Sequence, residues 1–354
     1  MKQSSLGLGT STKRTRRREF LDEMDRVVPW SDLVAEIAPF MPEGKRGRPP
    51  FPVESLLRIH FMQQWFTLSD PAMEEALHDV PLFRDFAGLG GWDDRLPDES
   101  TILRFRHVLE KHKLAERILA TVNLLLGAKG LMLRSGTVVD ATLISAPSST
   151  KNASGERDPE MHQSKKGQQW FFGMKAHIGV DADSGLVHTV RGTSGNVNDV
   201  VEANSLLHGQ ETDVFADAGY QGAHKRPDAK EDVKWHVAMR PGKRKLLDKT
   251  DPVDALTEQI ERIKASIRAK VEHPFRVIKR QFGHVKVRYR GLAKNTAQLH
   301  TLFALANLWM VRKRLSGSPR VRHQNADFAF LVKPLPCEST TYAHFCGSFV
   351  VATA

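Results

Sequence analysis

Apolar residues recur at helical spacing through the first third of the chain. Residues 53–66 carry a broad apolar face that is typical of one helix. Ser69-Asp70-Pro71 predicts the start of a second helix, and residues 97–101 predict the start of a third. Residues 20–40 are typical of a short amphipathic helix. The pattern therefore predicts an all-helical domain over residues 20–127.

The role of this helical domain stays open at the level of sequence. Short helices with tight turns and interleaved basic residues such as Arg104 and Arg106 are typical of a helix-turn-helix-like DNA-binding module. The same pattern is equally typical of a helical packing or dimerisation domain.

The pattern changes to strand-like apolar runs after residue 127. Residues 131–144 predict a pair of strands, and residues 170–180 and 186–191 predict a hairpin, because turn-forming residues separate these two runs. Residues 152–168 are polar and rich in charge, which predicts a loop.

Further strands and helices alternate in the rest of this region. We expect strands at residues 212–216 and 235–239 and a long helix over residues 256–280, which Pro274 kinks or ends. A helix is also expected at residues 200–207 and a final, largely buried one at 295–315. This order predicts an α/β domain over residues 128–315. Residues 1–19 are interpreted as a flexible basic arm, and residues 316–354 as a tail without a matching pattern.

Composition narrows the class of protein. The chain of 354 residues holds 52 Lys and Arg against 41 Asp and Glu, a net charge of +11, which favours polyanionic partners such as nucleic acid. Its two cysteines exclude a disulfide framework or a cysteine-rich zinc site. The longest apolar stretch, residues 299–311, is too short to span a bilayer. We therefore expect a cytoplasmic protein without a membrane partner.

Three acidic residues are the main candidates for chemistry. Asp140 and Asp217 each end an apolar run, and Glu272 lies in a long basic segment with helical periodicity. Carboxylates that converge from strand ends and a helix bind hard divalent cations, and a pair of such ions promotes phosphoryl displacement. An aspartate at a strand end is more often a turn or capping residue. Rival carboxylates of that kind are Asp181, Asp183 and Asp199.

Basic residues crowd around the candidate glutamate. Residues 261–290 contain ten Lys and Arg but only two acids, Glu261 and Glu272. Too few acids are present to pair these bases, so the segment is predicted to contact phosphates.

Several motifs together resemble one enzyme family. They are Val139-Asp140-Ala141-Thr142, Ala216-Asp217-Ala218-Gly219-Tyr220 and the segments 157–167, 173–181, 195–199 and 271–279. Over residues 20–315 the chain resembles DDE-type transposases of bacterial insertion sequences, in the group related to insertion sequence 5. This resemblance implies an RNase H-like catalytic core preceded by the helical domain.

The resemblance has two departures. The family carries a Tyr–Arg–Glu–Lys signature, which Arg268, Glu272 and Lys279 match, while Ala265 occupies the tyrosine position. The tail over residues 316–354 has no counterpart in the family.

The resemblance also implies a mechanism. Asp140 would bridge two Mg²⁺ ions, which Mn²⁺ can replace, and Asp217 and Glu272 would each complete one coordination sphere. The enzyme would nick DNA at the terminal inverted repeats, and the freed 3′-OH would attack target DNA. A homodimer associated with the nucleoid is expected, because two element ends must be joined. The residues expected to contact DNA are Arg268, Arg276, Lys279 and Arg280, together with Lys165, Lys166 and Trp170.

Three other functions remain open. A metal-dependent nuclease would use the same three acids without joining strands, and an inactive transposon-derived protein would only bind DNA. A zinc hydrolase built on His162, His177 and His188 is a weaker hypothesis, because these residues show no known ligand spacing. Trp170 is either a base-stacking residue or an ordinary core residue of its strand.

Overall fold

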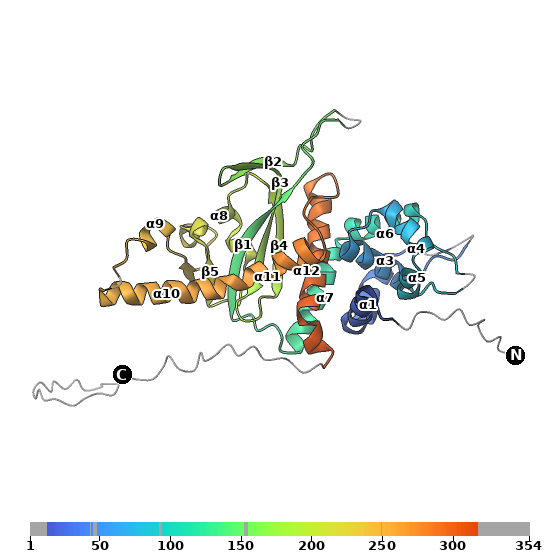
Figure 1. Ribbon diagram of the computed structural model, residues 1–354, viewed down its shortest axis with the longest axis horizontal. Coiled ribbons are helices and arrows are strands. Elements are labelled where there is room, and N and C mark those ends of the chain that lie inside the picture. The colour runs from blue at the N-terminus through green and yellow to red at the C-terminus, as the bar shows by residue number, and fades with distance from the viewer. Residues whose placement is uncertain are drawn as a thin grey trace, which may run out of the picture. The chain divides into compact units, whose positions relative to one another are not determined.

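The computed structural model describes residues 13–42, 44, 48–91, 94–151, 155–248 and 250–317 (Figure 1). An N-terminal helical region precedes a mixed α/β sheet domain, which confirms the predicted fold class. Residues 1–12 of the predicted arm and residues 318–354 of the predicted tail lie outside the described residues.

The helical region follows the capping signals in the sequence. Thr15, Ser69 and Asp98 each accept a backbone N–H at a helix start, which satisfies donors that the first turn leaves unpaired. The first helix begins at Arg16, so residues 16–19 of the predicted arm are helical. The elements are α1 (Arg16–Val27), α2 (Trp30–Ile37), η1 (Ala38–Phe40), α3 (Val53–Phe66), α4 (Asp70–Asp79), α5 (Pro81–Ala87), α6 (Glu99–Lys111) and α7 (Leu114–Ala128).

A six-stranded sheet forms the centre of the second region. Its strands are β1 (Gly136–Ser145), β2 (His162–Lys166), β3 (Gln169–Asp181), β4 (Val187–Ser194), β5 (Asp213–Ala216) and β6 (Lys234–Val237). β3 pairs antiparallel with β1, β2 and β4, whereas β5 pairs parallel with both β1 and β6. The predicted β3–β4 hairpin is confirmed.

Two strand predictions were wrong. Residues 131–144 form one strand and not two, because Leu131 and Met132 are buried in the connection that follows α7. The predicted loop over residues 152–168 contains β2. This strand pairs with β3 alone and its side chains are mostly exposed, so it lacks the apolar alternation from which strands are predicted.

The helices of this region lie around the sheet (Figure 1). The predicted long helix is interrupted at residues 269–271 and not at Pro274, which lies in the first turn of the next helix, where proline is tolerated. The elements are α8 (Asp199–Glu202), η2 (Asn204–Leu206), η3 (Ala218–Tyr220), η4 (Ala223–Lys225), α9 (Pro241–Arg244), α10 (Pro252–Arg268), η5 (Ala269–Val271), α11 (Glu272–Arg276), η6 (Val277–Gln281) and α12 (Leu292–Leu315). η6 is a π-helical turn.

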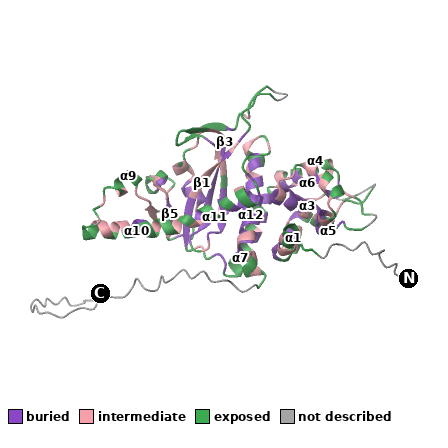
Figure 2. Ribbon diagram, viewed as in Figure 1, coloured by how far each residue is buried: buried purple, intermediate pink, exposed green. Residues whose placement is uncertain are grey.

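The hydrophobic core covers both faces of the sheet, and Figure 2 shows the buried residues gathered along the strands and α12. α12 is buried along most of its length, as predicted. Its Asn307 side chain accepts the Val187 N–H at 2.8 Å and donates to the Asn123 side chain at 2.9 Å. These bonds satisfy polar groups that would otherwise be costly to bury. No helix within the described ranges is both long enough and apolar enough to cross a membrane.

Candidate active site

Asp140 lies on β1, and Asp217 directly follows the neighbouring strand β5. β1 and β5 are parallel, and Val138 lies opposite Phe215. Each aspartate follows two residues later, so the register brings the two carboxylates to the same face of the sheet. Asp140 accepts the Ala141 N–H at 2.7 Å, and Asp217 accepts the Gly219 N–H at 2.8 Å.

Glu272 approaches this pair from the helical layer. It is the first residue of α11 and follows η5, which lies against β1. Burial raises the pKa of Asp140 to about 7, the Ala141 hydrogen bond opposes this shift, and the negative charges of Asp217 and Glu272 add to it. The three carboxylates therefore share one electrostatic environment.

This donor set fits divalent cations. Asp140, Asp217 and Glu272 offer only oxygen ligands, which Mg²⁺ and Mn²⁺ prefer, and their mutual repulsion is what a bound cation would relieve. Among the described residues the three do not form a group whose oxygens lie within 4.8 Å of one another.

Two residues of the predicted signature lie around the acids. Arg268 ends α10, and its positive charge lowers the pKa of Asp140. Lys279 donates to Thr142 Oγ1 at 2.6 Å and to the Leu143 carbonyl at 3.0 Å. Burial lowers the pKa of Lys279, the charge of Lys166 lowers it further, and Glu272 opposes both effects. The structure thus brings Lys166, Lys279 and Glu272 into one neighbourhood.

The β2–β3 hairpin presents the other predicted DNA contacts. Lys165 and Lys166 are exposed on β2, and Lys165 lies over the Trp170 ring, 6.0 Å from its centroid. Trp170 is 63% exposed, so the interpretation of this side chain as a core residue is wrong. Arg276 and Arg280 are also exposed, on α11 and η6.

The basic segment is better paired than its composition predicts. Arg262 and Lys264 form ion pairs with Glu258 and Glu261 at 3.2 and 2.8 Å. Lys270 donates to the Ala182 carbonyl at 2.6 Å. Three of the ten bases therefore have partners in the protein, because a backbone carbonyl and Glu258, which precedes residues 261–290, also act as acceptors.

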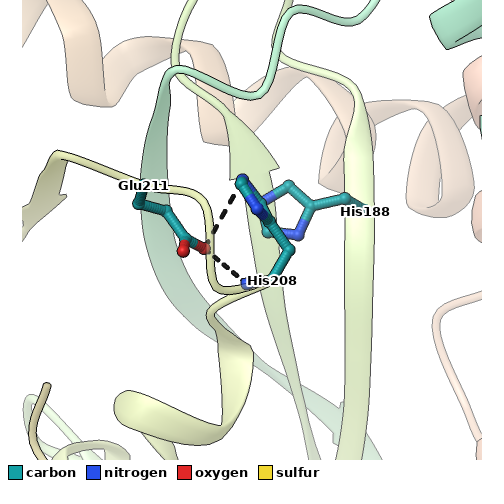
Figure 3. A group of neighbouring side chains, drawn as sticks. All are labelled: His188, His208 and Glu211. Carbon is teal, nitrogen blue, oxygen red and sulfur yellow. Dashed lines mark hydrogen bonds and ion pairs between the residues drawn. The ribbon is translucent and has the colours of Figure 1, made fainter.

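The predicted zinc hydrolase site does not assemble. The rings of His162, His177 and His188 bond to three different hydroxyl groups, those of Ser194, Thr193 and Thr137. His188 lies instead beside His208 and Glu211 (Figure 3).

Tyr220 is a buried residue to which the sequence pattern assigns no role. Its side chain is 1% exposed, and its hydroxyl has no hydrogen-bond partner among the described residues. Burial raises its pKa, and the charges of Asp140, Asp199 and Asp217 raise it further. Tyr220 therefore adds an unused hydroxyl donor next to the carboxylates. The motif around Asp217 contained this residue, but a motif does not show which way its side chain points.

Asp199 was ranked as a rival carboxylate. It accepts a hydrogen bond from Lys175 Nζ at 2.9 Å, and Lys175 also donates to the Val197 carbonyl at 2.7 Å. The ion pair anchors the segment before α8 to β3, and Asn198 is the residue that caps α8. Asp181 accepts the Arg134 and Ser184 N–H groups, as expected of a turn residue.

Two regions of the chain match known families. Residues 132–308 match the model of the transposase DDE domain, and residues 10–108 match a model described as transposase domain (DUF772). The first match covers half of the chain and coincides with the sheet region, and the second coincides with the helical region.

Proposed function

The chain belongs to the family of transposases with a DDE domain, and on this premise we propose that it cuts and joins DNA strands at the ends of a transposable element. Asp140, Asp217 and Glu272 are the proposed catalytic carboxylates. The observation that carries this proposal is the placement of Asp140 on β1, Asp217 directly after β5 and Glu272 at the start of α11, close enough together for the charges of both other acids to add to the raised pKa of Asp140. Perturbed carboxylates of this kind are typical of functional sites.

The three carboxylates would hold two Mg²⁺ ions, or Mn²⁺ in their place, which activate the attacking oxygen and stabilise the leaving one when bound. Asp140 has the central position, because it is affected by both other acids. Arg268 and Tyr220 lie around the same carboxylates. In the proposed complex Arg268 offsets negative charge, and the Tyr220 hydroxyl donates to a phosphate oxygen or a bound water.

The remaining residues would position DNA. Lys279 lies close enough to Lys166 and Glu272 for both charges to affect its pKa, and the two lysines together would neutralise a phosphate next to the scissile bond. Trp170 would stack on an unpaired base beside Lys165, since aromatic stacking holds bases without regard to sequence. Arg276 and Arg280 would follow the backbone of the terminal repeat.

We propose that the two matched regions have different functions. The helical domain over residues 20–127 would recognise the terminal inverted repeat, and residues 128–315 would perform the chemistry on the repeat and on target DNA. A homodimer would synapse two element ends, and membership of the group related to insertion sequence 5 is part of the same proposal.

A strand-transfer assay tests this function. Purified protein is incubated with Mg²⁺, a labelled duplex carrying the terminal repeat, and a target plasmid. We expect cleaved and joined products from the wild-type protein, and neither from Glu272→Gln, while the variant still shifts the labelled duplex in a gel. Glu258→Gln serves as a matched control on the neighbouring helix, because Glu258 is paired with Arg244 and Arg262 away from the carboxylate cluster.

Two outcomes would replace the proposal. Cleavage without joining, on saturating target DNA, would identify a nuclease. Binding of the repeat without either reaction would identify an inactive DNA-binding relative, for which Ala265 at the tyrosine position of the signature is the first substitution to revert.

A further inference from the structure

Three side chains of types that can ligate a metal lie close together outside the carboxylate site. They are His188 of β4 and His208 and Glu211 of the connection between η2 and β5 (Figure 3). In the described part of the chain, one donor atom from each residue lies within 4.8 Å of the other two. The Glu211 side chain is fully buried, and that of His208 is 9% exposed.

The backbone is shaped to aim the His188 ring inward. Val180 pairs with Val187 and Gly179 pairs with Thr189, so His188 is the extra residue of a β-bulge. A bulge redirects a side chain that regular pairing would point elsewhere. A Cβ atom at Gly179 would lie 2.7 Å from the His188 ring, so the glycine leaves the space that the ring occupies.

Glu211 is oriented by several donors. Its Oε2 accepts the Gly209 N–H at 2.6 Å, and its Oε1 accepts the Thr137 hydroxyl at 3.2 Å and the His208 N–H. Thr137 also contacts His188 Nε2 at 3.1 Å. The Thr137 hydroxyl of β1 therefore contacts both the Glu211 carboxylate and the His188 ring of β4.

One buried ring nitrogen of this cluster makes an ion-pair contact but no hydrogen bond. His208 Nε2 is buried without a hydrogen bond among the described residues and lies 3.5 Å from Glu211 Oε1. The two imidazole rings cross edge to face, with centroids 4.7 Å apart (Figure 3). A buried ring nitrogen that faces a carboxylate and a second imidazole without a hydrogen bond offers a place where an ion can bind.

We propose that His188, His208 and Glu211 bind a divalent transition-metal ion of the zinc class, at a site separate from the three catalytic carboxylates. Two imidazoles and one carboxylate form a recognised zinc ligand set. Nitrogen ligands also favour zinc over magnesium, which takes oxygen ligands. The second contact of His188, from Nδ1 to Thr189 Oγ1 at 2.9 Å, is the kind of outer hydrogen bond that orients a ligating ring.

The ion would stabilise the contact between β4 and the segment that leads into β5. Thr137 lies three residues before Asp140 on β1, and Glu211 lies two residues before the start of β5. An ion held there fastens β4 to the segment that leads into β5. Because Thr137 of β1 donates to Glu211, we expect the ion also to restrict β1, which carries Asp140, relative to the segment that leads through β5 to Asp217.

Binding requires a local rearrangement at both rings. Thr137 donates to Glu211, so His188 Nε2 donates to Thr137. When His188 Nε2 binds the ion, its proton moves to Nδ1, which then donates to Thr189 Oγ1.

The second rearrangement is at His208. His208 Nδ1 accepts the Gln210 N–H at 3.2 Å, which leaves the ring proton on Nε2. When His208 Nε2 binds an ion, the ring proton moves to Nδ1. The Gln210 N–H then loses its acceptor and donates to a water molecule instead. Gln210 is exposed, so a solvent molecule can accept the hydrogen bond of its N–H group.

The test uses full-length protein carrying Asp140→Asn and Glu272→Gln, so that ions at the catalytic carboxylates do not contribute. The protein is loaded with Zn²⁺, freed of unbound ion by gel filtration, and analysed for zinc by mass spectrometry. We expect one bound ion per chain, which His208→Gln or Glu211→Gln removes when added to this background. His224→Gln, at an exposed histidine, is the matched control and should retain the ion.

Two results would overturn the proposal. One is a parent protein that retains no zinc, and the other is equal zinc in the parent and in both ligand variants. Should a ligand variant fail to fold by circular dichroism, the parent decides alone. Loaded with Co²⁺, it must show the visible absorption of a tetrahedral nitrogen- and oxygen-ligated ion, and the absence of that band rejects the site. Because the zinc measurement needs no DNA, its failure is distinguishable from failure of the transposase function.

Discussion

Lys279 is fastened to β1 by Thr142, whose hydroxyl accepts a hydrogen bond from Lys279 Nζ at 2.6 Å. Thr142 lies two residues beyond Asp140 on the same face of β1. A residue expected to hold DNA is therefore also part of the contact between the π-turn and the catalytic strand. The contact of Lys279 with β1 and its contact with DNA are tested by separate substitutions.

Thr142→Val is expected to destabilise the protein by about 1–3 kcal/mol, because it leaves a partly buried ammonium with one acceptor fewer. Urea unfolding measures this loss, and an unchanged midpoint would show that the bond contributes nothing. The variant keeps the lysine charge, so the salt dependence of DNA binding should not change.

Lys279→Met removes both the bond and the charge. The slope of log affinity against log salt should fall by about one unit, as for the loss of one phosphate contact. The measurement is repeat binding across a salt series, with Thr142→Val as the control for destabilisation. An unchanged slope would argue that Lys279 has a structural role only.

Asp140→Asn is expected to change how stability depends on pH. The pKa of Asp140 is raised to about 7 by burial and by its acidic neighbours, while an unfolded aspartate titrates near pH 4. Between these values the folded protein holds a proton that the unfolded chain has lost, so wild-type stability falls as pH rises towards 7. Above pH 7 this cost is complete.

The variant should therefore match wild type near about pH 4 and be the more stable protein near about pH 8. Thermal unfolding without divalent ions measures the difference, with the exposed Asp232→Asn as control. Parallel pH profiles for wild type and Asp140→Asn would contradict the raised pKa. Added Mg²⁺ should stabilise only the wild type.

Trp170→Ala is expected to weaken DNA binding without changing stability. The ring is 63% exposed, so its loss costs the fold little, whereas one base stacked on an aromatic ring contributes about 1–3 kcal/mol. Anisotropy with a partly single-stranded repeat end measures the effect. Leu124→Ala, at a comparably exposed residue of α7, should leave affinity unchanged, and equal affinities for all three proteins would remove Trp170 from the interface.

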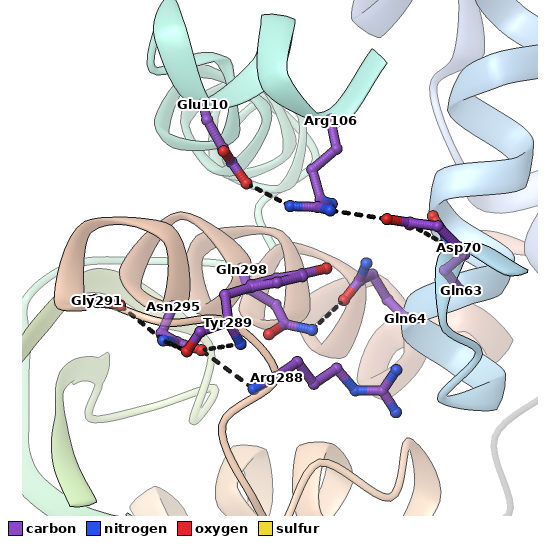
Figure 4. A network of polar contacts seen from close by, with 10 residues as sticks. All are labelled: Gln63, Gln64, Asp70, Arg106, Glu110, Arg288, Tyr289, Gly291, Asn295 and Gln298. Carbon is purple, nitrogen blue, oxygen red and sulfur yellow. Dashed lines mark hydrogen bonds and ion pairs between the residues drawn. The ribbon is translucent and has the colours of Figure 1, made fainter. Parts of the chain in front are cut away.

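Arg106→Met is expected to be strongly destabilising. Arg106 is 8% exposed and pairs with Asp70 at 2.8 Å and Glu110 at 3.0 Å (Figure 4). Its guanidinium also lies 4.2 Å from the centroid of Tyr289, in the segment before α12. Removing one partner of a buried ion pair costs about 3–5 kcal/mol.

Denaturant unfolding of this variant measures the loss, and the neighbouring, exposed Arg104→Met is the matched control. A loss no larger than that of the control would mean that the network in Figure 4 does not hold the helical region to α12.

Elements whose signal in the sequence is local were predicted correctly. The apolar face of residues 53–66 and the turn between β3 and β4 gave the correct elements, because helix periodicity and turn chemistry depend only on neighbours in the chain. The level at which Asp140 and Asp217 meet follows from parallel pairing of β1 and β5, which the sequence indicated only through the family resemblance.

The remaining features depend on contacts between distant residues. β2 forms because β3 offers it an edge, and Lys270 is paired by a carbonyl 88 positions away. The cluster of His188, His208 and Glu211 has no ligand spacing in sequence, because a bulge and a connecting segment bring its members together. None of these partners is visible in a pattern of single residues.

The π-turn Val277–Gln281 also determines how the chain tolerates changes in length. A π-turn contains one residue more than the α-helical turn that it replaces, so deleting one residue there converts it to an ordinary turn and leaves the flanking faces in place. One residue removed from α10 would instead rotate every following helical residue by about 100°, and Glu272 with them. A deletion of one residue is therefore expected to be tolerated in the π-turn but not in α10, although both belong to the same basic stretch of the chain.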